Sequence, residues 1–154
     1  MANIQSLSFS EALKSSTSKI FVFSGRARRS EFWWSMMTVY IICATIPALG
    51  LIGSVVSIPI TFRRLHDTGR SGWWCGANII FQFVLGCSLI YKLLYFGFGW
   101  VDPLFIDIKF VVMQMTWLLV MLIALAIYQV VLIVMLCQDS ELFENRYGPS
   151  PKYA

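Results

Sequence analysis

The sequence predicts an all-α membrane protein, a polytopic bundle of about four transmembrane helices preceded by a short N-terminal interfacial helix. Hydrophobic residues make up 58% of the 154 residues and charged residues only 13%, whereas a soluble domain is about a quarter charged. Several uncharged runs reach the roughly 20 residues that a helix needs to cross the bilayer. Lys and Arg gather in short clusters between these runs, as topology signals do. We therefore expect one integral-membrane domain over residues 1–154.

The N-terminal segment, residues 1–29, is predicted to be cytoplasmic and amphipathic. Ser8 and Glu11 have the spacing of a capping box. The apolar residues that fall close to one helix face are Phe9, Ala12, Leu13 and Ile20. This pattern predicts a short helix at the membrane interface, with a frayed polar N-terminus as the alternative.

Residues 32–62 contain no charged residue, and this run is too long for one ordinary span and too short for two. Basic residues stand at both ends, so the positive-inside rule places both ends in the cytoplasm. Pro47 and Gly50 near the middle favour a reversal of the chain. We predict a hairpin of two short helices, with a single long tilted helix as the competing interpretation.

Two further hydrophobic segments complete the predicted membrane region, residues 30–137. After a polar loop near residues 63–71, the first segment is interrupted only by Lys92 near its far end, and we expect that side chain to reach toward the interface. A mixed-charge loop near residues 99–109 is expected on the outside. Residues 110–137 then form an uncharged stretch that is long enough to cross the bilayer.

Four spans place both termini, including the polar tail of residues 138–154, on the cytoplasmic side. The net charge is +4, but the cations flank hydrophobic runs, which suits membrane topology better than nucleic-acid binding. Basic clusters beside a membrane attract anionic headgroups by about 1 kcal/mol per residue. The four cysteines and single histidine show no metal-ligand or disulfide spacing. We expect membrane lipids as partners, and no nucleic acid, metal or cofactor.

Three motifs stand out at the edges of the hydrophobic runs. They are residues 25–34 (GRARRSEFWW), 63–74 (RRLHDTGRSGWW) and 144–152 (ENRYGPSPK). In this order they resemble the signature of a family of small bacterial inner-membrane proteins, the domain-of-unknown-function 805 family. The resemblance implies a multi-pass protein of the bacterial inner membrane and implies no activity.

The first motif has a simple physical role as a membrane anchor. Arg26, Arg28 and Arg29 would hold this end of the span in the cytoplasm, and Ser30 could cap the helix. The two tryptophans that follow suit the interfacial belt. A specific lipid or partner site is the alternative to this anchoring role.

The middle motif contains features that anchoring does not require. Asp67 could cap the turn or pair with a nearby arginine. The backbone amides of residues 68–72, together with the next helix N-terminus, could face an anion such as phosphate. His66 could act as an acid or base, although adjacent side chains seldom face each other. A structural role, a headgroup contact and catalysis are all open, and the structural role is favoured.

The tail motif is predicted to form a fixed turn that folds back on the middle loop. Asn145, Arg146 and Tyr147 precede a Gly-Pro pair that cannot continue a helix, and Glu144 could pair with Arg63, Arg64 or Arg70 of the middle motif. We predict that the three motifs converge into one cytoplasmic polar cap.

The leading functional hypothesis is a non-enzymatic accessory protein whose basic cap binds anionic lipid, a membrane-protein partner or a second copy. No catalytic residue is assigned. The candidate binding residues are Arg26, Arg28, Arg29, Arg63, Arg64, His66, Asp67, Arg70, Asn145, Arg146 and Tyr147.

Two alternatives remain. One is a lipid- or envelope-modifying enzyme that uses His66 and Asp67. The other is a small transporter or channel subunit, although few polar residues interrupt the predicted spans, and Gln114 and Gln129 are expected to bond across helices.

Overall fold

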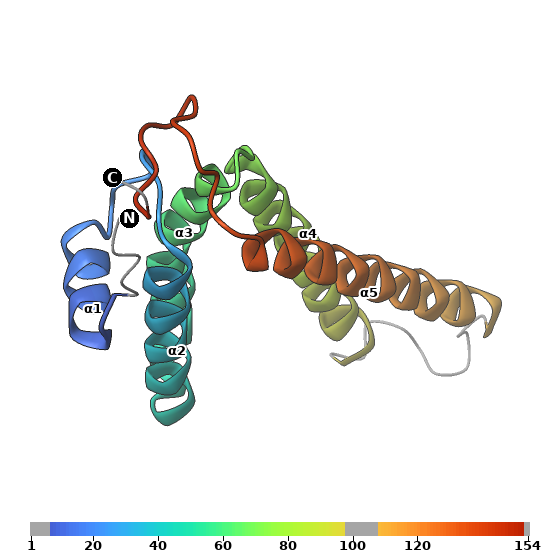
Figure 1. Cartoon of the computed structure of the whole chain (residues 1–154). Coiled ribbons are helices and arrows are strands. Elements are labelled where there is room, and N and C mark those ends of the chain that lie inside the picture. The colour runs from blue at the N-terminus through green and yellow to red at the C-terminus, as the bar shows by residue number, and fades with distance from the viewer. Residues whose placement is uncertain (1–6, 98–107, 153–154) are drawn as a thin grey trace. The chain divides into compact units, whose positions relative to one another are not determined.

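The computed structural model describes residues 7–97 and 108–152, and the regular elements of this part of the chain are helices, with one isolated bridge, Asn145 to Gly148, in the tail. The all-α class is therefore as predicted. The chain forms two compact units, residues 76–132 and the remainder. The elements, labelled in Figure 1, are α1 Phe9–Ser18, α2 Arg29–Thr45, the 3-10 turn η1 Pro47–Leu49, α3 Gly50–Asp67, α4 Trp73–Gly97 and α5 Ile108–Cys137.

Helix α1 confirms the predicted N-terminal helix. The Ser8 side chain accepts from the Glu11 amide while the Glu11 carboxylate accepts from the Ser8 amide, which completes the capping box. Ala12 is fully buried, and the Phe9 ring lies edge-on to Trp34 with centroids 5.4 Å apart. Figure 1 shows α1 beside α2. The helix thus packs on the first turns of α2 and does not extend away from them.

Helices α2 and α3 form the predicted hairpin. At its open end the Ala27 amide donates to the Arg63 carbonyl over 3.1 Å. Nearer the turn, a Cβ added to Gly53 would lie 2.4 Å from the Cys43 sulfur, so the two helices approach more closely than a larger residue would allow. Helix α2 ends just before Pro47, which disfavours helical geometry in the residue before it. A single long helix is excluded.

Helix α3 continues to Asp67, into the segment predicted as a polar loop. It then ends in a tight turn in which the amides of Thr68, Gly69 and Arg70 donate back to the last carbonyls of the helix. Gly69 has a φ of 71° there, a conformation that glycine adopts without strain. Arg63, Arg64 and Asp67 are therefore helical residues.

In the second unit, α4 and α5 run antiparallel. The Gln129 side chain donates to the Asn78 side chain over 3.1 Å, which confirms the cross-helix bond expected of Gln129. The Lys92 ammonium donates to the Gln114 carbonyl over 2.6 Å, and Lys92 is buried. Lys92 therefore has a hydrogen-bond acceptor on α5, and the expectation that its side chain reaches toward the interface stays a prediction.

Three segments of the described chain are long and apolar enough to cross a membrane, whereas we predicted four. Helix α2 is not among them, since it has only 17 residues and its first turn contains Arg29 and Glu31. The predicted outer loop near 99–109 falls almost wholly outside the described residues. The segments are Pro47–Asp67, Trp73–Tyr95 and Ile108–Cys137.

Candidate functional site

Arg26 of the first motif joins the other two motifs through all five of its N–H donors. Its Nε donates to the Asp67 carboxylate over 2.9 Å and one Nη to the Asp67 carbonyl over 3.2 Å. The remaining donors reach three tail carbonyls, at Glu141 (2.7 Å), Phe143 (2.9 Å) and Gly148 (3.2 Å). Only a planar guanidinium offers five donors in this fork. The predicted convergence of the three motifs is confirmed.

Arg64 of the middle motif binds the C-terminal end of α5. Its Nε donates to the Leu136 carbonyl over 3.0 Å, and one Nη donates to the Gln138 carbonyl. The last carbonyls of a helix lack partners within the helix and carry its negative dipole end. Arg64 therefore serves as a charged cap for α5, while its other Nη donates to Asp67.

Asp67 is the acceptor shared by these two arginines. Its carboxylate receives Arg26, Arg64 and the Ser140 hydroxyl, and the residue has no exposed surface. Buried charges are tolerated only when they are paired and hydrogen-bonded. Asp67 therefore pairs with arginine, one of the two roles predicted for it, and is fully engaged in the fold.

A second buried ion pair, between Arg63 and Glu31, lies where α2 begins and α3 ends. The Arg63 Nη1 lies 3.1 Å from Glu31 Oε1, and both residues are less than 5% exposed. The Ser15 hydroxyl of α1 donates to the same Glu31 oxygen over 3.2 Å. This pair was not predicted, and Ser30 does not cap α2, because that helix begins at Arg29 without a side-chain cap.

The tail forms the predicted turn. The amides and carbonyls of Asn145 and Gly148 bond to each other, and the Asn145 side chain donates to the His66 carbonyl over 3.0 Å. The Tyr147 ring stacks on His66 with centroids 3.7 Å apart and an interplanar angle of 6°. The Arg146 guanidinium lies over the Tyr147 ring, with its central carbon 4.7 Å from the ring centroid.

A salt bridge at the edge of the tail joins Lys152 Nζ to the Asp139 carboxylate over 2.7 Å. This hydrogen bond and the one from the Ser140 amide hold the pKa of Asp139 below its ordinary value. Asp139 is therefore negative at neutral pH, although its solvent exposure makes the pair a weak contributor to stability.

Glu144 does not take the role predicted for it. Among the described residues it belongs to none of the salt bridges, because nearer acceptors occupy the middle-motif arginines. Those acceptors are Glu31 for Arg63, Asp67 for Arg64 and the Gln138 side chain for Arg70.

The structure explains the two glycines of the middle motif, Gly69 and Gly72, by close packing and not by a phosphate-binding site. The amides of residues 68–70 already donate to helix carbonyls, and the Glu141 carboxylate lies so close to Gly69 that an added Cβ would come within 2.0 Å of it. A Cβ at Gly72 would meet the Phe62 ring at 2.1 Å. The turn is thus covered by a negative charge, which does not favour an anion there.

His66 and Asp67 engage different partners. The His66 Nδ1 lies 3.3 Å from the Gly25 carbonyl, whereas the Asp67 carboxylate is occupied by two arginines. Within residues 7–97 and 108–152, no group of three or more His, Cys, Asp or Glu side chains could hold a metal ion. The geometry therefore brings no acid–base pair together at this position.

The predicted binding residues divide by exposure. Arg26, Arg63, Arg64 and Asp67 are buried, and Arg29 and Arg146 are exposed. The five that are partly exposed are Arg28, His66, Arg70, Asn145 and Tyr147.

We use the name polar cap for the cluster of residues that joins the three motifs. Sequence reasoning missed Glu31, Ser140 and Glu141 as its members. Glu31 could have been predicted, because it is a single acidic residue at the start of an uncharged run. Backbone carbonyl acceptors cannot be predicted in this way, because every residue has one. The members of the polar cap are Arg26, Glu31, Arg63, Arg64, His66, Asp67, Ser140, Glu141, Asn145, Tyr147 and Gly148.

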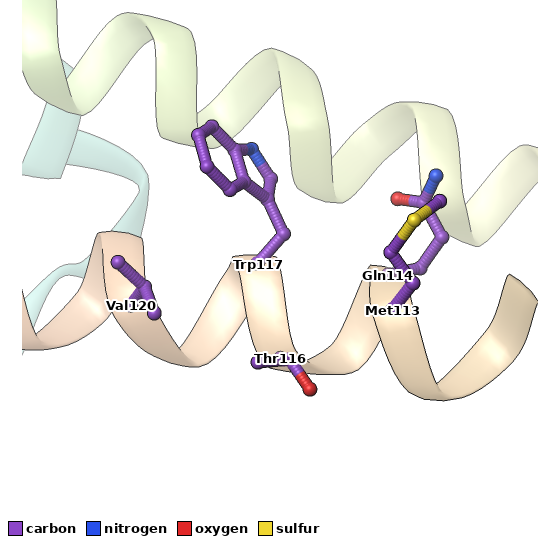
Figure 2. Close-up of a pocket in the computed structure, with 5 residues that line it drawn as sticks. All are labelled: Met113, Gln114, Thr116, Trp117 and Val120. Carbon is purple, nitrogen blue, oxygen red and sulfur yellow. The ribbon is translucent and has the colours of Figure 1, made fainter. Parts of the chain in front are cut away.

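A shallow apolar pocket of about 430 Å³ lies along α5 in the second unit, lined by five residues of that helix. Figure 2 shows Gln114 and Trp117 pointing toward the neighbouring helix and Thr116 pointing away. Because the pocket lies on a candidate span, its apolar lining is the surface that a lipid-facing helix presents. We assign it no separate role.

These features define a class, a small helical membrane protein whose charged motifs assemble a polar cap at the ends of its helices. The family described as "Protein of unknown function (DUF805)" matches residues 40–149, which is more than half of the chain, and the chain belongs to this family. The predicted resemblance is confirmed.

Two curated relatives come from Escherichia coli strain K12. The chain is 26% identical over 149 residues to "Inner membrane protein YhaH", covering 84% of this chain and 87% of that protein. It is 30% identical over 146 residues to "Inner membrane protein YhaI", covering 85% and 86% respectively. No solved structure gives a significant match. The relatives and the apolar helices identify an inner-membrane protein.

Proposed function

We propose that this chain is a non-enzymatic accessory protein of the bacterial inner membrane whose exposed cations bind anionic phospholipid headgroups. The observation that carries the proposal is the arrangement at the start of α2. There the exposed Arg29 is followed within two turns by Trp33 and Trp34, which are 41% and 39% exposed. Cations beside exposed tryptophans are typical of the boundary between headgroups and hydrocarbon.

The N-terminal segment extends this boundary. Lys14 and Lys19 are exposed on and just after α1, and Phe21 and Phe23 follow with exposures of 84% and 46%. Aromatic rings and lysines on a short helix are the composition of a segment that lies at a membrane surface. The interfacial position of α1 is therefore part of the proposal.

The orientation follows from the distribution of charge. Two hairpins, α2–α3 and α4–α5, are the four proposed membrane helices, and the polar cap with both termini lies in the cytoplasm. Residues 1–29, the middle motif and the tail contain ten of the twelve Lys and Arg residues, as the positive-inside rule expects of one face. The start of α2 and the ends of α3 and α5 all contact the polar cap, which supports hairpins that leave and return on one side.

The structure separates the cations that hold the polar cap from those that could meet lipid. Arg26, Arg63 and Arg64 are buried and pair with carboxylates inside the protein. A lipid headgroup would therefore reach mainly the set of exposed cations. In the first unit, that set comprises Lys14, Lys19, Arg29 and Arg146.

The test compares the thermal unfolding of the protein in nanodiscs of phosphatidylglycerol and of phosphatidylcholine. We expect the wild type to unfold several degrees higher in phosphatidylglycerol, because each nearby cation gains about 1 kcal/mol from an anionic surface. The variant Lys14→Gln/Lys19→Gln/Arg29→Gln/Arg146→Gln should lose this difference. The matched control exchanges Lys and Arg at the same positions and should keep it. A neutralised variant with an undiminished preference would refute headgroup binding.

A further inference from the structure

The tip of the α2–α3 hairpin is apolar and exposed. Residues 45–53, which form the tip, include no charged side chain. Its large side chains face outward, with Ile46 50%, Leu51 84% and Ile52 59% exposed. A hairpin that emerged into water would bring these side chains into contact with it, at a cost of about 25 cal/mol for each Å² of apolar surface.

Several polar groups at the tip and just after it have hydrogen-bond partners within the protein. The Thr45 hydroxyl donates to the Ile42 carbonyl over 3.0 Å, and the Ser54 hydroxyl donates to the Gly50 carbonyl over 2.8 Å. In the turn itself the Leu49 amide donates to the Ile46 carbonyl over 2.9 Å. Pro47 has no amide to satisfy. Internal satisfaction of this kind is what hydrocarbon demands of any backbone placed within it.

The hairpin is also short. Helix α2 has 17 residues and is therefore about 25 Å long. Its first turn belongs to the polar cap, because Glu31 pairs with Arg63. On the other arm, Arg63 to Asp67 belong to the polar cap, which leaves residues 50–62, or about 20 Å of helix. The hydrocarbon layer is about 30 Å thick.

Local thinning of the bilayer does not reconcile these lengths, because the same chain contains a much longer span. Helix α5 has 30 residues, about 45 Å. Even at a tilt of about 40°, the upper end of the usual range, it covers roughly 34 Å. A bilayer that suits α5 is therefore thicker than the reach of the hairpin.

We propose that the α2–α3 hairpin is re-entrant: it enters from the side of the polar cap, and its tip, residues 45–53, ends among lipid acyl chains without reaching the opposite surface. The hairpin then acts as an apolar wedge that holds the polar cap against one leaflet. The partner of this surface is the acyl region of the bilayer. The inference rests on the proposed function only for naming the cytoplasmic side.

The experiment uses single cysteines in the full chain, with the four native cysteines replaced by serine. Ala48→Cys reports the tip, Glu144→Cys reports the polar cap, and Asp102→Cys reports the predicted outer loop. A membrane-impermeant maleimide is applied to spheroplasts and to inverted vesicles. We expect Glu144→Cys to react only in inverted vesicles, Asp102→Cys only in spheroplasts, and Ala48→Cys in neither until detergent is added.

A spin label attached to Ala48→Cys provides a second measurement, the accessibility of the tip to oxygen and to a water-soluble nickel chelate. In proteoliposomes we expect high accessibility to oxygen and low accessibility to a water-soluble nickel chelate, which is the signature of acyl chains. Labelling of Ala48→Cys in spheroplasts at the rate of Asp102→Cys would overturn the proposal, and so would protection from both oxygen and nickel, which would mean a protein partner at the tip. These outcomes are independent of the nanodisc comparison, so either proposal can fail alone.

Discussion

At the residue scale, two arginines of the motifs, Arg26 and Arg64, donate mainly to backbone carbonyls. Arg26 and Arg64 together hold five carbonyl oxygens of α5 and the tail, at Leu136, Gln138, Glu141, Phe143 and Gly148. Within residues 7–97 and 108–152, three buried arginines face two buried carboxylates, Glu31 and Asp67. The carbonyl dipoles offset the remaining positive charge, which explains why arginine, with its many donors, occupies these positions.

Replacement of Arg26 by lysine should strongly destabilise the polar cap. The ammonium keeps the charge but offers three donors from a single point, so most of the five hydrogen bonds are lost. We expect a loss of about 3 kcal/mol or more in the free energy of unfolding, as for other disrupted buried ion pairs. Thermal unfolding in a fixed detergent measures the change. Arg29→Lys, at an exposed position, is the control, and equal effects of the two substitutions would contradict the role assigned to Arg26.

At the element scale, the α2–α3 hairpin depends on close approach of its two helices. Gly53 faces Val39 and Cys43 with no room for a side chain. Without a hydrophobic driving force between helices in lipid, such small residues let the backbones make dense van der Waals contact. The same helices are pinned at their open end by the Arg63–Glu31 pair, so the hairpin is fixed near both of its ends.

Gly53→Ala should destabilise the hairpin although alanine is the better helix former. The added Cβ would lie 2.4 Å from the Cys43 sulfur, and overpacking of this kind costs about 1 to 3 kcal/mol. Gly50→Ala is the matched control, because nothing lies within 4 Å of its Cβ position and helix propensity alone favours alanine by up to about 1 kcal/mol. Opposite signs in the unfolding temperature are expected. A stabilising Gly53→Ala would show that the helices are not in close contact.

At the scale of the whole molecule, the polar cap collects the ends of helices that are far apart in sequence. It links the first turn of α2, the last turn of α3, the C-terminus of α5 and the tail through residues separated by as many as 122 positions. The tail, shown in red in Figure 1, is therefore a structural part of the first unit.

Removal of residues 141–154 should lower the stability of the polar cap while the apolar helices stay inserted, since their hydrophobic lengths are unchanged. The deletion removes three of the carbonyls that Arg26 binds. In the truncated protein Arg26→Lys should therefore cost much less than in the full chain, because coupled residues are not additive. Unfolding temperatures of the four proteins form the cycle. Additive effects would mean that the tail and Arg26 act independently.

Much of the fold followed from local patterns. The capping box at Ser8 and Glu11, the reversal at Pro47 and the bond of Gln129 are each set by residues near in sequence or by a polar group that has few partners in an apolar helix. The prediction failed where a partner came from a distant segment. Glu144 was expected to pair with Arg63, Arg64 or Arg70, but each of these arginines binds an acceptor that only the folded chain brings close.

The sequence by itself determined that this is a membrane protein and that its chain reverses near Pro47. It also determined the family to which the chain belongs. These properties depend on hydropathy, charge placement and short motifs, all of which are local. The tertiary structure alone decided that three of the motif arginines, Arg26, Arg63 and Arg64, are buried. It also decided that Glu31, Asp67 and the carbonyls of α5 and the tail are their acceptors. The physical reason is that a buried cation takes whichever oxygen the fold presents, and a backbone carbonyl is the same in every residue.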